Sequence, residues 1–96
     1  MIEVTNVRIH RIFNDPDKMF VGVASIVLND AIAINDIRIL KSPDKMFVAM
    51  PNRKLGESTY KDMVHPVDHE TRKIIEEAIL SAYIQAVREQ EESEEA

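Results

Sequence analysis

The sequence contains no cysteine, which excludes a disulfide framework and a thiolate metal site. This absence is typical of proteins in the reducing cytoplasm, so we expect a cytoplasmic location. The two glycines, Gly22 and Gly56, stand too far apart to form a glycine-rich phosphate loop, and no G-x-S-x-G nucleophile motif is present. We therefore expect a protein that is not an enzyme and that needs no cofactor.

Long apolar runs are missing as well. No stretch of about 18 apolar residues is present, and the first residues do not form a basic and then apolar leader. We therefore expect neither a membrane span nor a secretory signal. The 96 residues, 45% of them hydrophobic, are enough for one modest core. We expect one domain at residues 1–88 and an acidic, disordered tail at residues 89–96.

Basic residues are outnumbered, because 12 Lys and Arg face 17 Asp and Glu and leave a net charge of −5. Phosphate contacts need Lys and Arg, so this balance argues at first against a nucleic-acid partner. The acidic excess is concentrated, however, at the end of the chain. Residues 1–66 carry nine basic and eight acidic side chains, whereas residues 67–96 carry three basic and nine acidic ones. A local basic surface on the first two thirds is therefore compatible with the composition.

The sequence does contain a series of β-type segments separated by polar turns. In the first and third segments the apolar alternation changes phase, at residues 5–6 and 35–36, which predicts a β-bulge in each. Both the turn at residues 14–18, with Pro16, and the turn at residues 41–45 contain Pro-Asp-Lys, so we expect two similar hairpins. The predicted strands are residues 2–13, 19–29, 31–40, 46–50 and 59–65.

After Pro66 the apolar pattern takes a helical period. Asp68 is a good N-cap, and Glu70 is favourable at the positive end of the helix dipole. Like charges at residues 89–95 lie at the unfavourable end, so we expect fraying beyond Val87. The fold class predicted is α+β, an antiparallel β-meander of four to five strands followed by a C-terminal helix. The apolar stripe of that helix is Ile74, Ile75, Ala78, Ile79, Ala82, Tyr83, Ala86 and Val87.

One helix can cover only one face of such a sheet. The second and fourth predicted strands nevertheless carry apolar side chains on both faces, and such strands need cover on both. We therefore expect a homodimer in which the sheet surface or its edge strands pack against a second copy. The alternative is a monomer whose twisted sheet curls over itself. The second strand has Phe20, Ala24, Ile26 and Leu28 on one face and Met19, Val21, Val23 and Val27 on the other.

A metal site is not expected. His65, Asp68 and His69 have ligand-like side chains, but Pro66 places His65 before the helix, and no third protein ligand is identifiable. The simpler interpretation is that His65 satisfies backbone groups at the junction, while His69 is solvated in the first turn.

A group of basic residues lies in the polar loop predicted at residues 52–58, in the strand that follows and in the first turns of the helix. With one asparagine and one tyrosine beside them, such residues can hold a phosphate backbone and reach base edges. Arg8 and Arg38, at matching places in the two hairpins, would extend that surface. The alternative is that each is a solubilising charge near an acid. The predicted nucleic-acid-binding residues are Asn52, Arg53, Lys54, Tyr60, Lys61, Arg72 and Lys73.

The ordered motifs of the chain resemble those of the stage V sporulation protein G (SpoVG) family. In order they are EVTNVRI, NDIRI, FVAMP, a basic pair, an aromatic–basic–Asp triplet, HP and TRKI. The resemblance fades in the acidic tail, and the loop departs from the family pattern at Leu55, Gly56 and Glu57.

This resemblance implies a dimeric regulator of septation and sporulation that binds DNA, with RNA binding attributed to some members. By the same resemblance, the basic segment after FVAMP corresponds to Arg53, Lys54 and Lys61, and TR supplies Arg72.

An alternative function is a protein-interaction module that controls septation through a protein partner, with the apolar sheet face or the acidic tail as its docking surface.

Overall fold

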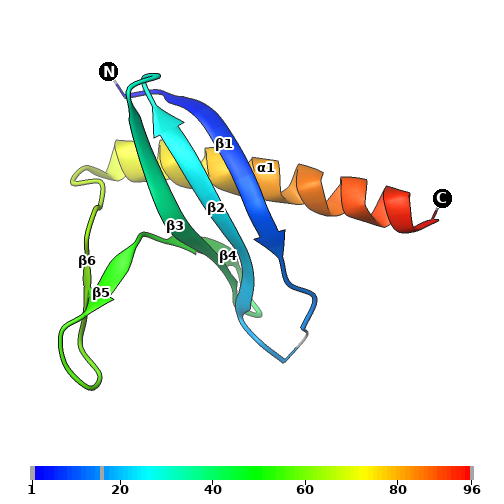
Figure 1. Ribbon diagram of the computed structural model, residues 1–96, viewed down its shortest axis with the longest axis horizontal. Helices are drawn as coiled ribbons and strands as arrows, with labels where there is room; N and C mark the ends of the chain where they lie inside the picture. Colours follow the sequence, from blue (N-terminus) through cyan, green and yellow to red (C-terminus); the bar gives the residue numbers. More distant parts are fainter. Residues whose placement is uncertain (1, 16, 96) are drawn as a thin grey trace.

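The structure is a computed structural model that describes residues 2–15 and 17–95. In this part of the chain, four strands form an antiparallel sheet in the order β1-β2-β3-β4, and two more form a separate ribbon. The helix α1 crosses one face of the larger sheet (Figure 1). The predicted α+β fold is confirmed. The elements are β1 (Val4–Ile12), β2 (Phe20–Leu28), β3 (Ile32–Lys41), β4 (Met46–Ala49), β5 (Asn52–Lys54), β6 (Tyr60–Asp62) and α1 (His69–Glu95).

Both predicted bulges are present. The register of β1 shifts between Val4 and Asn6, and in β3 residues 35–36 lie opposite the single residue 25 of β2. Asp36 has a φ of 59°, in the left-handed region that Asp tolerates better than most residues. The bulge in β3 allows Ile34 and Ile37, three positions apart, to be buried on the same face.

The sequence did not predict two further register shifts. One lies between Ile9 and Arg11 in β1, and the other between Phe20 and Gly22 in β2. Because of the shift in β2, the predicted faces of this strand were wrong at its start. Val21 is the extra residue and belongs to the buried core, whereas Phe20 pairs on the opposite face.

The turn between β2 and β3 fixes their pairing. Asn29 and Asp30 have φ angles of 51° and 53°, and the Ala31 N–H donates to the carbonyl oxygen of Leu28 at 2.9 Å. Two positive φ angles define a type I′ turn, whose twist matches that of the flanking strands.

The core lies between α1 and the sheet. From the predicted stripe, Ile75, Ile79 and Tyr83 are buried, and they pack with the buried isoleucines of β2 and β3, including Ile26 and Ile37. The helix packs against β1, β4 and β2. Its apolar stripe was therefore predicted correctly.

Asp68 caps α1 as predicted, since its Oδ2 accepts a hydrogen bond from the Thr71 N–H at 2.9 Å. The hydrogen bonds from Thr71 lower the pKa of the Asp68 carboxyl. At its other end the helix runs to Glu95, about two turns beyond Val87. The acidic segment is thus helical in the structure, and the fraying expected there stays a prediction. Ala96 lies outside the described residues.

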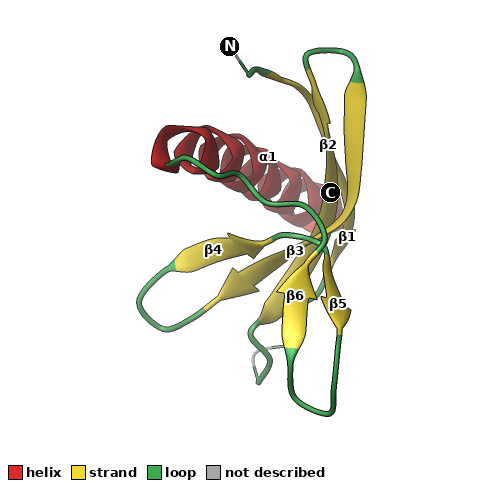
Figure 2. Cartoon of the chain, turned by 90° about the vertical axis from the view of Figure 1, so that its left-hand side faces the viewer, coloured by secondary structure: helices red, strands yellow, loops and turns green. Residues whose placement is uncertain are grey.

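The segment after β4 differs from the prediction. Residues 52–58 were expected to be a loop, but Asn52–Lys54 form β5 and pair with β6 in a hairpin. Two backbone hydrogen bonds extend the hairpin, from the Leu55 N–H to the Thr59 oxygen (2.8 Å) and from the Met63 N–H to the Pro51 oxygen (2.7 Å). Residues 51–63, called the arm below, project from the sheet (Figure 2). The predicted fifth strand therefore belongs to the arm and not to the sheet.

The face of the sheet turned away from α1 is called the outer face. It is apolar along β2 and β4, as predicted, but β1 and β3 add arginines, which lowers its apolar character. Dimerisation across this face or along a sheet edge stays a prediction. Strand pairing gives the outer face one row of Phe20, Leu40 and Phe47 and another of Arg11, Val23, Arg38 and Ala49.

Candidate nucleic-acid interface

The arm presents three of the predicted basic residues. Arg53 lies directly opposite Lys61, and Lys54 lies opposite Tyr60, and all four side chains are exposed. Like charges directly opposite in a ribbon repel each other and destabilise it. No acid within the described residues forms an ion pair with these three cations. Their charges are therefore available to a polyanion.

Asn52 stands at the base of the arm. It lines a hollow of about 480 Å³ between the arm and the outer face, together with Pro51 and Met63 from the arm. From the sheet, the hollow is lined by Phe20, Val23, Asp36 and Arg38. The arm and the outer face are thus two walls of one concave surface.

Arg72 and Lys73 lie apart from the arm. They occupy the first turns of α1, which packs on the sheet, whereas β5 and β6 pack on each other. Figure 1 shows the start of the helix separated from the tip of the arm by β6 and by the link that follows it. The structure therefore gathers Asn52, Arg53 and the two lysines of the arm, but places the helix pair elsewhere.

Arginines on the outer face extend the basic surface. Arg8 lies opposite Ser25, and Arg11 and Arg38 flank Val23 in one row. Within the described residues none of these three guanidinium groups has an ion-pair or hydrogen-bond partner. Arg8 and Arg38 were considered from the sequence, but Arg11 was missed because the register shift beside it turns its side chain to this face.

Within the described residues, no group of three or more His, Asp and Glu side chains is placed to hold a metal ion. His10 instead shares a hydrogen bond with Ser25, with 2.8 Å between Nε2 and Oγ. Likewise, no helix formed by the described residues is long and apolar enough to cross a membrane.

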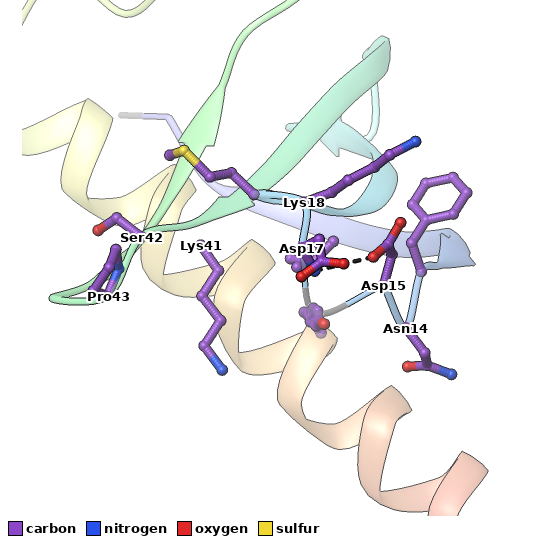
Figure 3. Close-up of a pocket in the computed structure, with 11 residues that line it drawn as sticks. Asn14, Asp15, Asp17, Lys18, Lys41, Ser42 and Pro43 are labelled. Carbon is purple, nitrogen blue, oxygen red and sulfur yellow. Dashed lines mark hydrogen bonds between the residues drawn. The ribbon is translucent and has the colours of Figure 1, made fainter.

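A second hollow, of about 570 Å³, is lined by residues of two turns, including Asp17 and Lys18 from one and Ser42 and Pro43 from the other (Figure 3). Tyr83 of α1 also lines it. The charges of this hollow balance, since Asp15 and Asp17 stand with Lys18 and Lys41 along its wall. The Asp15 Oδ1 is engaged by the Asp17 N–H at 3.0 Å, which organises the turn. A hollow with balanced charges offers no net attraction to a polyanion, so it is not included in the candidate interface. Pro16, which was expected in this turn, lies outside the described residues.

Comparison with known proteins identifies the family. The chain matches the SpoVG family model over residues 2–85. It is 43% identical over 82 residues to a protein of Phytoplasma australiense named "Putative septation protein SpoVG", covering 85% of this chain and 83% of that protein. A protein of the same name from Geobacillus thermodenitrificans is 38% identical over 95 residues, covering 99% and 97% of the two chains. This chain therefore belongs to the SpoVG family.

Proposed function

We propose that this protein regulates septation and sporulation by binding DNA, with RNA as a second ligand, through the cations of its arm. The observation that carries the proposal is the facing pair Arg53 and Lys61, with Lys54 beside it, all exposed and without an acid partner in the described part of the chain. Such a pair weakens an isolated ribbon, and a bound phosphate backbone relieves the repulsion. The name of the relatives, "Putative septation protein SpoVG", supports the septation role.

Binding of this kind needs no covalent chemistry. Affinity arises from counterion release at phosphates and from hydrogen bonds, for which Asn52 and Tyr60 provide amide and hydroxyl groups. Arg72 and Lys73 lie separately at the start of α1, with the acids Asp68, Glu70, Glu76 and Glu77 in the same turns. In this proposal the arm supplies most of the salt-dependent affinity.

The test is a salt titration of oligonucleotide binding by fluorescence anisotropy. We expect Arg53→Ala with Lys54→Ala to weaken binding and to reduce the slope of log K against log salt by about 2, roughly one for each lost phosphate contact. The charge-matched control is Lys41→Ala with Arg88→Ala, which removes two exposed cations elsewhere and should leave the slope unchanged. Equal slopes for the arm variant and the wild type would remove the arm from the interface.

A second candidate function is the control of septation through a protein partner. It is favoured by the large exposed apolar side chains of the arm and of the link to α1, since such patches often mark protein contacts. A pull-down that survives nuclease treatment and is lost in Met63→Ser would support it over nucleic-acid binding. The exposed fractions are 54% for Leu55, 60% for Met63, 43% for Val64 and 91% for Val67.

We also propose that the protein is a homodimer. The apolar row of the outer face and the unpaired backbone edge of β4 each offer a place for a second copy. Sedimentation at micromolar concentration gives the oligomeric state directly, and a protomer mass alone would contradict this part of the proposal.

A further inference from the structure

The phenylalanines of this chain have an unusual location. The sequence contains three, Phe13, Phe20 and Phe47, and none belongs to the buried core beneath α1. Phe20 and Phe47 flank Leu40 in a row across the outer face, and Phe13 packs edge-on against Phe20 with 5.1 Å between ring centroids. Phe20 and Phe47 are only half-buried on the outer face, whereas aromatic rings normally contribute most where they are fully buried, so their placement needs another explanation.

The arginine row runs beside these rings. Arg38 is two positions before Leu40 on β3, so the two rows are about 7 Å apart. Arg11 on β1 lies two strands away from Arg38, at about 10 Å across the sheet. Arg8 lies on the same strand, three positions before Arg11. The outer face therefore combines flat apolar rings with three guanidinium groups that have no partner in the described residues.

We infer that the outer face binds a single-stranded segment of nucleic acid, with bases stacked on Phe20 and Phe47 and phosphates held by Arg8, Arg11 and Arg38. This inference rests on the proposed function and names its ligand class. Only unpaired nucleotides expose their base faces to aromatic side chains, and sheets that present rings and cations together bind single strands in this way. The hollow at the base of the arm continues the path toward Arg53 and Lys61.

The charge of the outer face favours a polyanion over a second copy. A twofold interface on this face would bury the same three arginines from each copy, six guanidinium groups in one interface. Among the described residues, Asp36 is the one acid that lines the hollow at the base of the arm, and Asp15 lines a neighbouring hollow with Phe20, so these acids would compensate only part of that charge. Interface cores are depleted in charged residues, whereas phosphates provide the opposite charge. A dimer formed along the edge of β4 would leave the outer face open.

The experiment uses the full chain and two fluorescent probes, a single strand of about 12 nucleotides and a duplex of the same sequence. We expect Phe20→Leu and Phe47→Leu each to weaken single-strand binding by about 5- to 100-fold, as stacking on one aromatic predicts, and to change duplex binding less than about twofold. Ile32→Ala is the control, because this side chain is 60% exposed at the far end of the sheet. Thermal melts identify any variant that fails to fold.

Arg11→Ala provides a test that does not depend on packing, since this side chain is exposed. It should weaken single-strand binding and leave the melting temperature unchanged. The inference would be overturned if single-strand binding is unchanged in Phe20→Leu, Phe47→Leu and Arg11→Ala while the arm variant, Arg53→Ala with Lys54→Ala, binds weakly. That result would leave the proposed function standing. A phenylalanine variant that instead converts a dimer to a monomer would assign the face to a second copy. If the wild type binds neither probe, the proposed function itself fails.

Discussion

The packing of α1 is tested by shortening one buried and one exposed isoleucine of the same helix. Ile79 is 0% exposed and contacts the core, whereas Ile84 is 46% exposed. Replacing a buried isoleucine by alanine removes three carbons and leaves a cavity that the sheet cannot fill completely. Such changes cost about 2–5 kcal/mol, and the complete burial of Ile79 favours about 3 kcal/mol or more.

This loss is large for a chain of this size. A domain of 96 residues has a free energy of unfolding of about 5–14 kcal/mol, and 1 kcal/mol shifts its melting temperature by about 4–8 °C. Ile79→Ala should therefore lower the melting temperature by at least about 12 °C. Ile84→Ala should change the free energy of unfolding by less than about 1 kcal/mol, because alanine is also a good helix former.

Urea and thermal denaturation followed by circular dichroism measure both variants. Equal losses for Ile79→Ala and Ile84→Ala would refute the packing described here, because the helix would then bury another face. If the cost at Ile84 rises with protein concentration, the exposed side of α1 is covered by a second copy.

Three further outcomes follow from local geometry. Asp36→Val should destabilise the fold by about 1–2 kcal/mol in urea melts, while Asp36→Gly should be neutral or stabilising, because the φ of 59° is open to glycine and strained for valine. Asp68→Ala should destabilise the fold by removing the N-cap of α1. The pKa of Asp68 is lower in the folded state than the value of 3.8 in the unfolded state. The ionised cap therefore stabilises the fold fully above pH 3.8, and this stabilisation disappears as the pH falls through the folded-state pKa. Acid titration of wild type and variant should therefore converge at low pH, and a constant difference would contradict this origin. Hydrogen exchange should be fastest in α1 beyond Val87, and uniform protection to Glu95 would contradict the predicted fraying.

Much of the fold was predictable because one-dimensional patterns determine it. Each phase change of the alternation marks a bulge, so residues 5–6 and 35–36 were located from the sequence alone. The stripe of α1 likewise follows from helical spacing, and Ile75 and Ile79 are buried where it predicts. In both cases the signal lies within a single element.

The arm and the outer face were harder to predict. Strand β5 contains Asn52, Arg53 and Lys54, which have no apolar alternation, so nothing in these residues distinguishes a strand from a loop. The hairpin forms through backbone hydrogen bonds to β6 and is almost entirely exposed. The rows of the outer face depend on the register between strands, which shifts at unpredicted positions. Arg11 and Phe20 could not be assigned to that face before the pairing was known.

The most direct test maps the amide shifts of isotope-labelled protein as a single-stranded oligonucleotide is added at low salt. We predict that the largest amide shift changes occur in the arm, at Arg53 and Lys61, and on the outer face, at Arg11 and Arg38. The amide shifts of the buried helix face near Ile79 should stay unchanged. Shifts confined to α1, or no shifts at saturating oligonucleotide, would contradict it.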